Sequence, residues 1–125
     1  MNFIGLAETS YSLLINILYF TAHHHMLNAD WEIASHGLRW IDYQNVPEAI
    51  ERAHVEEAIE LHMDLTGSRP LGWYQGRTSP NTARLIAAEG GFTYDADSYA
   101  DDLPYYDRQH GRPQLIVPYT LDVND

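Results

Sequence analysis

Residues 66–82 read TGSRPLGWYQGRTSPNT, and residues 31–44 read WEIASHGLRWIDYQ. Each stretch contains a predicted short, buried strand followed by a turn rich in polar, aromatic and glycine residues. Polar side chains that follow the ends of strands are typical of α/β active sites. The first stretch places His36 at the end of its strand. The second gathers two arginines and two aromatic residues within a few positions: Arg69, Trp73, Tyr74 and Arg77.

A long helix is predicted between these two stretches, at about 46–66. Asn45 is a suitable N-cap, and Gly67 stands where a C′ glycine belongs. Apolar residues at helical spacing predict the buried face, with His54 as a satisfied histidine within it. This predicted face consists of Ile50, Ala58, Leu61 and Leu65.

Strands and helices continue to alternate along the chain, which predicts an α/β fold. A second helix is expected at 80–90, with Ser79 as N-cap and Gly90 or Gly91 at its end. Residues 96–113 are predicted to form a long loop. The predicted strands are 31–35, 71–74, 92–95 and 114–119.

Length and composition indicate one globular domain. A complete (β/α) barrel needs about 250 residues, and this chain has 125. The net charge of −11 argues against nucleic-acid binding, because phosphates require a basic surface. The absence of cysteine excludes a disulfide scaffold and thiol chemistry. It fits a reducing compartment, and we expect a cytoplasmic protein.

Residues 1–25 form a segment that we consider apart from the rest. The apolar run YSLLINILYF at 11–20 is too short to span a bilayer. We expect an amphipathic or buried helix there and no membrane partner; a wrongly assigned start of the chain is the alternative. The consecutive residues His23, His24 and His25 point in different directions, so we do not expect them to bind a metal.

Four aspartates lie close together at the end of the predicted 92–95 strand and in the predicted loop that follows it. Calcium binding is the first hypothesis for such a cluster, but Tyr99 occupies the third ligand position of the EF-hand pattern and no glycine follows it. We therefore interpret the cluster as a solvated acidic loop. Its members are Asp95, Asp97, Asp101 and Asp102.

Several motifs resemble the polysaccharide deacetylase (NodB-like) superfamily, and within it the allantoinase-like branch. Deacetylases carry a motif with two metal-binding histidines; His36 is similar to the first, whereas Trp40 stands where the second is expected. RPLGWYQGRTSPNT (69–82), YDADSYADDLPYY (94–106) and LIVPYTLDVND (115–125) also resemble this branch. The resemblance covers residues 26–125 and implies part of a distorted (β/α) barrel, with residues 1–25 outside the family domain.

Two family motifs have no counterpart in this sequence. The acidic strand end that supplies the catalytic base is expected upstream of His36, and a Leu-x-x-His motif is expected downstream. The resemblance therefore implies a middle piece of a larger enzyme, which we expect to be inactive by itself.

Hydrolysis of an amide or a cyclic ureide needs an activated water, donors for the developing oxyanion and an acid for the leaving nitrogen. We expect catalytic roles for His36 as acid or oxyanion donor, for Asp102, and for Arg69, which the resemblance assigns to orienting the base. For each residue a structural role is the alternative, such as a surface ion pair for Arg69 or a core position for Trp73. The predicted substrate-binding residues are Trp40, Trp73, Tyr74, Arg77 and Asp101.

No metal is expected, because an indole ring offers no lone pair and Trp40 cannot replace a second histidine ligand. One divalent metal such as zinc, held through His36, is the alternative. The resulting prediction is a metal-independent C–N hydrolase that opens a small cyclic ureide or amide. The alternatives are a chitin-type polysaccharide N-deacetylase and a non-catalytic fragment, whose exposed sheet edges would favour a homo-oligomer.

Overall fold

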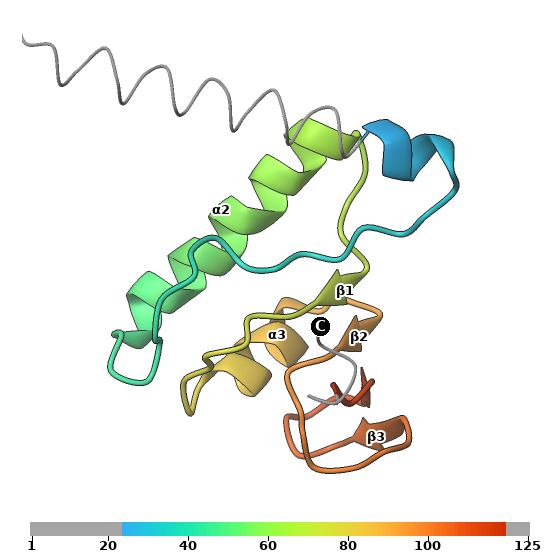
Figure 1. The fold of residues 1–125 in the computed structure, drawn as a ribbon. Helices are drawn as coiled ribbons and strands as arrows, with labels where there is room; N and C mark the ends of the chain where they lie inside the picture. The colour runs from blue at the N-terminus through green and yellow to red at the C-terminus, as the bar shows by residue number, and fades with distance from the viewer. Residues whose placement is uncertain (1–23, 120–125) are drawn as a thin grey trace, which may run out of the picture. The chain divides into compact units, whose positions relative to one another are not determined.

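The computed structural model describes residues 24–119, and the predictions for residues 1–23 lie outside this range. The chain divides into two compact units, residues 1–33 and 34–125. In the first unit, residues 24–28 are helical. The second unit contains all the named elements (Figure 1). They are α2 (Glu48–Thr66), β1 (Gly72–Trp73), α3 (Thr82–Glu89), β2 (Tyr94–Asp95), β3 (Tyr105–Asp107) and β4 (Gln114–Ile116).

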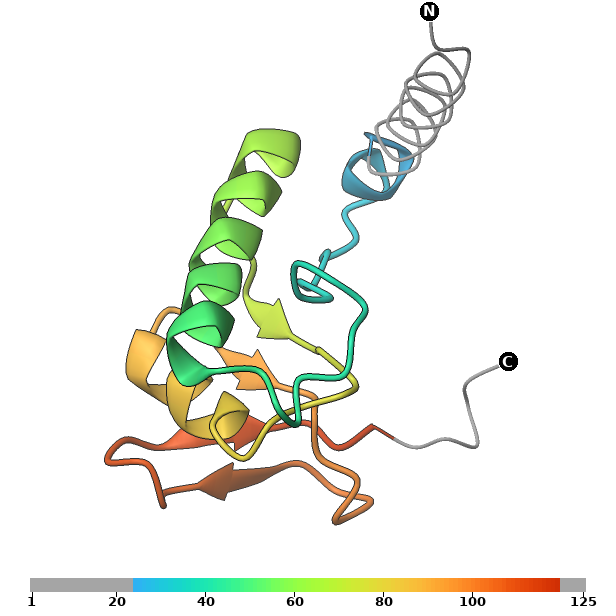
Figure 2. The ribbon, with the colours of Figure 1, turned by 90° about the vertical axis from the view of Figure 1, so that its left-hand side faces the viewer.

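The four strands form one sheet in the order β1-β2-β4-β3 (Figure 2). The pairs β1–β2 and β2–β4 are parallel, and β3 pairs antiparallel with β4. Ser35 adds an isolated parallel bridge to Trp73, the only trace of the predicted 31–35 strand. Because these segments run parallel, the residues that follow Ser35, β1, β2 and β4 all lie at the same end of the strands. We call this side of the sheet, where the parallel strands end, the carboxyl edge.

The α/β class is confirmed. Within residues 24–119 the strands form an open sheet of four strands, so the predicted partial barrel is not visible as a closed structure. The predicted loop at 96–113 is wrong in its middle, because residues 105–107 form β3. No helix in the described part of the chain is long and apolar enough to cross a membrane.

The first predicted helix is confirmed from Glu48 to Thr66, and Gly67 ends it with a φ of 75°. Its predicted cap is wrong: Pro47 takes the N-cap position, and no side chain of the described residues caps the helix. The predicted buried face is confirmed at Ala58 but wrong at Ile50, Leu61 and Leu65, which are exposed. The residues that face inward are Glu51, Val55, Ala58 and Ile59.

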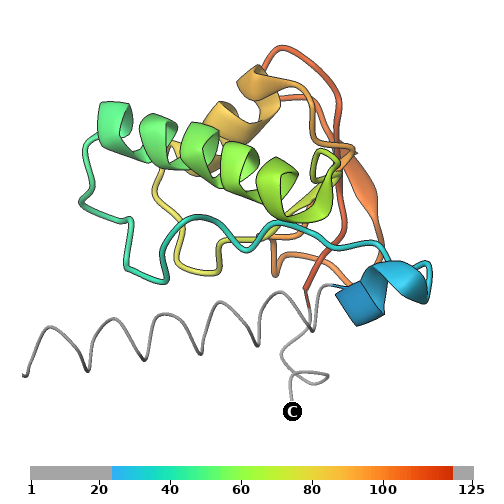
Figure 3. The same cartoon turned by 90° about the horizontal axis from the view of Figure 1, so that it is seen from above.

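Helix α3 covers the same face of the sheet as α2 (Figure 3). It starts at Thr82, with Asn81 rather than Ser79 at the N-cap position, and Gly90 ends it as predicted. Ser79 lies in the turn that precedes the helix, where its Oγ accepts a hydrogen bond from the Asn81 N–H at 2.9 Å.

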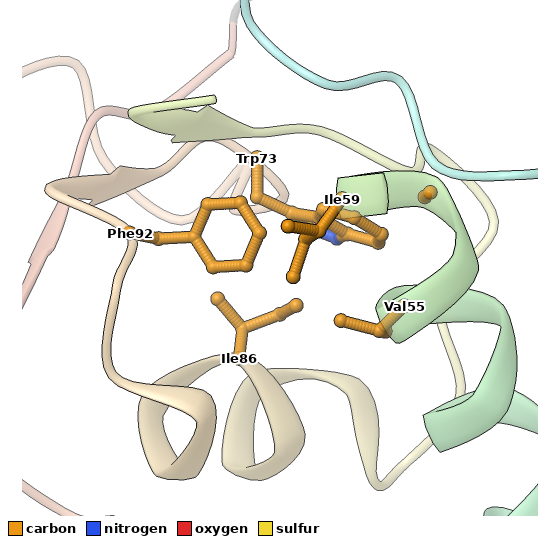
Figure 4. Packing of buried hydrophobic residues seen from close by; sticks show 6 residues of the cluster. Val55, Ile59, Trp73, Ile86 and Phe92 are labelled. Atoms are coloured by element: carbon orange, nitrogen blue, oxygen red, sulfur yellow. The ribbon is translucent and has the colours of Figure 1, made fainter. Parts of the chain in front are cut away.

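The hydrophobic core lies between α2, α3 and the sheet (Figure 4). Trp73 sits at its centre with only 1% of its surface exposed, and its ring meets Phe92 at 5.3 Å. The assignment of Trp73 to substrate binding is therefore corrected, because neither face of its ring is open to a ligand. The core cluster is Val55, Ala58, Ile59, Trp73, Ile86 and Phe92.

Candidate functional site

The carboxyl edge gathers polar and aromatic side chains from segments that are far apart in sequence. Hydrogen bonds continue past the strands: Tyr74 N–H donates to the Ser35 carbonyl, and Ala96 N–H to the Trp73 carbonyl, at 2.9 and 2.8 Å. This ladder holds the residues that follow each strand in register. The side chains brought together in this way are His36, Tyr74, Asp97 and Tyr119.

Aromatic rings form the most continuous part of this edge. Tyr74 stacks on Tyr119 with ring centroids 4.8 Å apart, and Tyr99 meets the Tyr119 ring edge-on at 6.0 Å. We call Tyr74, Tyr99 and Tyr119 the tyrosine cluster. His36 packs edge-on against Tyr74 with ring centroids 5.0 Å apart, so the imidazole predicted to be catalytic lies directly beside a predicted substrate-binding residue.

The hydroxyl group of Tyr74 remains protonated over the whole physiological range. Its oxygen lies 3.1 Å from the Tyr99 hydroxyl. This hydrogen bond, followed by burial, raises the pKa of Tyr74 well above its usual value. Tyr74 can therefore offer an aromatic face and a polar hydroxyl, but no phenolate charge.

The carboxyl group of Asp97 is held at the carboxyl edge by backbone hydrogen bonds. Its Oδ1 accepts the backbone N–H groups of Gln75 at 2.8 Å and Gly76 at 2.7 Å, and Gly76 adopts the required positive φ of 82°. Its Oδ2 is buried and has no hydrogen-bond partner among residues 24–119. Burial raises the pKa of Asp97, while the two backbone hydrogen bonds and the nearby charge of His36 oppose that rise.

Asp95, two residues earlier, is more deeply buried, with 3% of its surface exposed. Burial is the main reason that its pKa rises to about 6, and its Oδ1 accepts the Asp97 N–H at 2.9 Å. Both aspartates line a cavity of about 180 Å³ at the start of α3. The interpretation of these two residues as part of a solvated loop is therefore wrong, because Asp95 belongs to β2 and Asp97 is hydrogen-bonded against the 75–76 turn.

Two predicted binding residues, Trp40 and Arg77, lie against each other. The Arg77 guanidinium carbon stands 5.7 Å from the centroid of the Trp40 ring. Tyr43 N–H donates to the Arg77 carbonyl at 3.0 Å, which ties the 36–46 loop to the turn after β1. Trp40 is 78% exposed, so one large aromatic surface is free for a ligand.

Arg69 lies apart from these residues. It precedes β1, whereas His36 follows the Ser35 bridge that runs parallel to β1, so the two belong to opposite edges of the sheet. Its guanidinium pairs with Glu89 and stands over the Phe92 ring at 5.4 Å. Orientation of a catalytic base by Arg69 stays a prediction, and the carboxylate that it contacts in this structure is Glu89.

Asp101 and Asp102 are exposed in the segment between β2 and β3. The hydrogen bond described for them is local: the Asp102 N–H donates to the Asp101 side chain at 2.8 Å. Their predicted roles in substrate binding and catalysis also stay predictions.

Asp95, Asp97, Tyr99 and Tyr119 are the site residues that the sequence analysis did not assign. A usable signal was present for the aspartates, because Asp95 ends a predicted strand and Asp97 follows it by two residues. Aspartates at such a position belong to the carboxyl edge of a parallel sheet. The stacking of Tyr74 on Tyr119 joins residues 45 positions apart, and no local pattern announces it.

A divalent metal is the cofactor that deacetylases of this type imply. Within residues 24–119, no three His, Cys, Asp or Glu side chains converge in a geometry that could hold such an ion. The residues of this range do not form such a site by themselves, so no reaction step is assigned to a metal. The expectation of a metal-independent site stays a prediction.

The chain is similar to known proteins in both its sequence and its fold. No family model matches the chain. The protein named "Putative polysaccharide deacetylase" in Schizosaccharomyces pombe is 37% identical in an alignment of 116 positions, and the match covers 80% of this chain. The chain spans 36% of the length of that relative.

Two solved structures resemble this one over 82% of the chain and about a third of their own length. The crystal structure of Puue allantoinase is 56% identical with a TM-score of 0.79 and is matched over 35% of its chain. The crystal structure of a probable polysaccharide deacetylase from Pseudomonas aeruginosa PAO1 is 54% identical with a TM-score of 0.78, also over 35% of its chain. Together with the motifs around His36 and residues 69–82, these matches show that the chain belongs to the polysaccharide deacetylase (NodB-like) superfamily and covers part of its domain.

Proposed function

We propose that this chain carries the ring-binding and proton-donating part of a C–N hydrolase that opens a small cyclic ureide or amide. The observation that carries the proposal is the position of His36 beside Tyr74 at the carboxyl edge. The 56% identity to the Puue allantoinase structure supports the ureide as substrate class.

The imidazole of His36 is suited to the step in which the C–N bond breaks. It is exposed at the carboxyl edge, and an imidazole can carry a proton near neutral pH. In the proposed reaction, His36 acts in one of two ways. It donates its proton to the leaving ring nitrogen, or it donates a hydrogen bond to the oxyanion of the tetrahedral intermediate that forms before the C–N bond breaks. Asp97 lies close enough for the charge of His36 to stabilise its carboxylate.

Trp40 and Arg77 supply the proposed binding surface. A planar ureide ring would stack on the exposed indole face, and the guanidinium would donate hydrogen bonds to a ring carbonyl. Aromatic packing contributes about 0.5–1.5 kcal/mol beyond the area that it buries. The base that activates water is not assigned to a residue of this chain.

A polysaccharide N-deacetylase is the second candidate within the same reaction class. It is favoured by the names of the Schizosaccharomyces pombe and Pseudomonas aeruginosa relatives. The exposed faces of Trp40 and Tyr99 would also suit a sugar ring. The third candidate, a fragment without a small-molecule ligand, predicts that neither substrate binds.

Calorimetric titration of the purified chain separates these candidates. We expect allantoin to bind and acetylated chito-oligomers not to bind. Trp40→Leu should weaken allantoin binding by roughly tenfold, the upper range for a lost aromatic contact.

Binding of chito-oligomers without allantoin would replace the ureide proposal with the deacetylase. If the folded chain binds neither ligand, the proposed function fails, and the result supports the third candidate, a fragment without a small-molecule ligand.

A further inference from the structure

Glu51, in the first turn of α2, is a charged residue type at the start of the buried face of this helix, with 0% of its surface exposed. A buried carboxyl group costs several kcal/mol unless hydrogen bonds or opposite charges replace its water. No arginine or histidine of the described range pairs with it, since the ion pairs found there involve other carboxylates. Its compensation is therefore hydrogen bonding.

In the part of the chain that the structure describes, the side-chain donors to Glu51 come from one segment, residues 75–82, which runs from the end of β1 to the first residue of α3. Ser79 Oγ donates to Oε2 at 2.5 Å, and Thr82 Oγ1 donates to Oε1. Gln75 Nε2 completes the set at 3.4 Å from Oε1. Three side chains of this segment thus converge on one carboxyl group from α2.

The same segment also contacts the candidate site through its backbone. The backbone N–H groups of Gln75 and Gly76 are the two donors to Asp97 Oδ1. The Gln75 side chain also packs against the turn that carries His36, because a Cβ at Gly37 would lie 3.7 Å from Gln75 Cγ. Gln75 therefore links the Glu51 carboxyl group to the surroundings of both Asp97 and His36.

We propose that Glu51 is a positioning residue for the candidate site: its carboxylate fixes the 75–82 segment so that the Gln75 and Gly76 N–H groups hold Asp97 at the carboxyl edge, where His36 also lies. A glutamine would fill the same volume, but its NH₂ group cannot accept a hydrogen bond, so at least one hydroxyl donor would lose its partner. The displacement is expected at the 75–76 turn and not in the helix. The catalytic meaning of this arrangement rests on the proposed function, whereas the arrangement itself does not.

The test follows the amide protons of Gln75 and Gly76 by ¹H–¹⁵N NMR between pH 3 and 8. An amide proton that donates to a carboxylate shifts when that carboxylate takes up a proton, so both should titrate with Asp97 in the unchanged chain. Glu51→Gln should reduce the amplitude of both shifts by at least half while the core amides of Val55 and Ile59 keep their positions. The matched control is Glu57→Gln, an exposed position on the same helix, which should keep the full amplitude.

The amplitude is the appropriate readout because the charge of Glu51 itself affects the midpoint of the Asp97 titration. Full amplitude at both amides in folded Glu51→Gln would overturn the proposal. If Glu51→Gln does not fold, Thr82→Val removes one donor at nearly constant volume and should lower the amplitude partly. Unchanged amplitude in folded Thr82→Val would likewise overturn it. No substrate is used, so failure of this inference is distinguishable from failure of the hydrolase proposal.

Discussion

Replacing Asp95 with asparagine should stabilise the protein at neutral pH and change its pH dependence. Burial raises the pKa of the Asp95 carboxyl group from 3.8 to about 6, so the folded protein holds a proton that the unfolded chain releases at lower pH. Ionising this group in the folded state opposes folding. Each pKa unit corresponds to about 1.4 kcal/mol, so the rise corresponds to about 3 kcal/mol near pH 7.

The direction of the effect follows from the raised value in the folded state. The contribution of Asp95 to stability is fully present below about pH 4, near the pKa of the unfolded chain, and is lost as the pH rises through about 6. An asparagine side chain at this position would not titrate, and its oxygen would still accept the Asp97 N–H. The stability difference in favour of Asp95→Asn should therefore grow between pH 4 and pH 7, to about 3 kcal/mol at most.

Urea unfolding at half-unit steps from pH 4 to pH 8 measures this difference, with Asp102→Asn as an exposed control. The control should differ from the unchanged chain by no more than about 0.5 kcal/mol at any pH. A flat difference between Asp95→Asn and the unchanged chain across this range would refute the assignment of the raised pKa to buried Asp95.

Three further changes test the fold by the same unfolding assay. Ile86→Ala should cost about 2–5 kcal/mol because Ile86 is fully buried in the core, whereas Leu61→Ala at an exposed position should cost much less; equal losses would contradict the assigned core. Gly72→Ala should destabilise by about 1–3 kcal/mol because a Cβ there would overlap the Tyr94 ring, and adding Tyr94→Ala should recover part of the loss; no recovery would speak against this contact. Gly67→Ala should cost about 1 kcal/mol because Gly67 ends α2 with a positive φ, and within the described residues no atom lies within 4 Å of the added methyl; an unchanged midpoint would show that this backbone is not strained.

The C-terminal ends of the helices were the features that the sequence predicted best. Gly67 and Gly90 both end their helices in the left-handed region, as expected from the rarity of that conformation in other residues. The helix starts were predicted less well. Asn45 and Ser79 are good cap residues, but the preceding backbone places Pro47 and Asn81 at those positions.

The buried face of α2 could not be predicted from hydropathy alone. Glu51 appears as a solvent-facing residue in any apolar pattern, and its burial depends on hydroxyl donors 28 and 31 positions further along the chain. Because that face includes a glutamate, the predicted apolar stripe looked stronger than the true one. Such long-range compensation has no local signature.

The candidate site was predicted in part. His36, Tyr74, Trp40 and Arg77 lie around the turns that the quoted stretches indicated, because strand ends in a parallel sheet meet at one edge. Trp73 was misassigned because strand residues alternate between faces, and a one-residue difference decides between the core and the site. Asp97 was missed because its significance depends on backbone donors from a turn 21 residues earlier.

The central claim, that the carboxyl edge binds a cyclic ureide, is tested most directly by ¹H–¹⁵N and ¹H–¹³C NMR during titration with allantoin. We predict saturable shifts at the His36 imidazole, the Tyr74 ring and the Trp40 indole, with Arg69 and Glu89 at the opposite edge unchanged. Shifts confined to Arg69 and Glu89, or no shifts at millimolar allantoin, would contradict the claim.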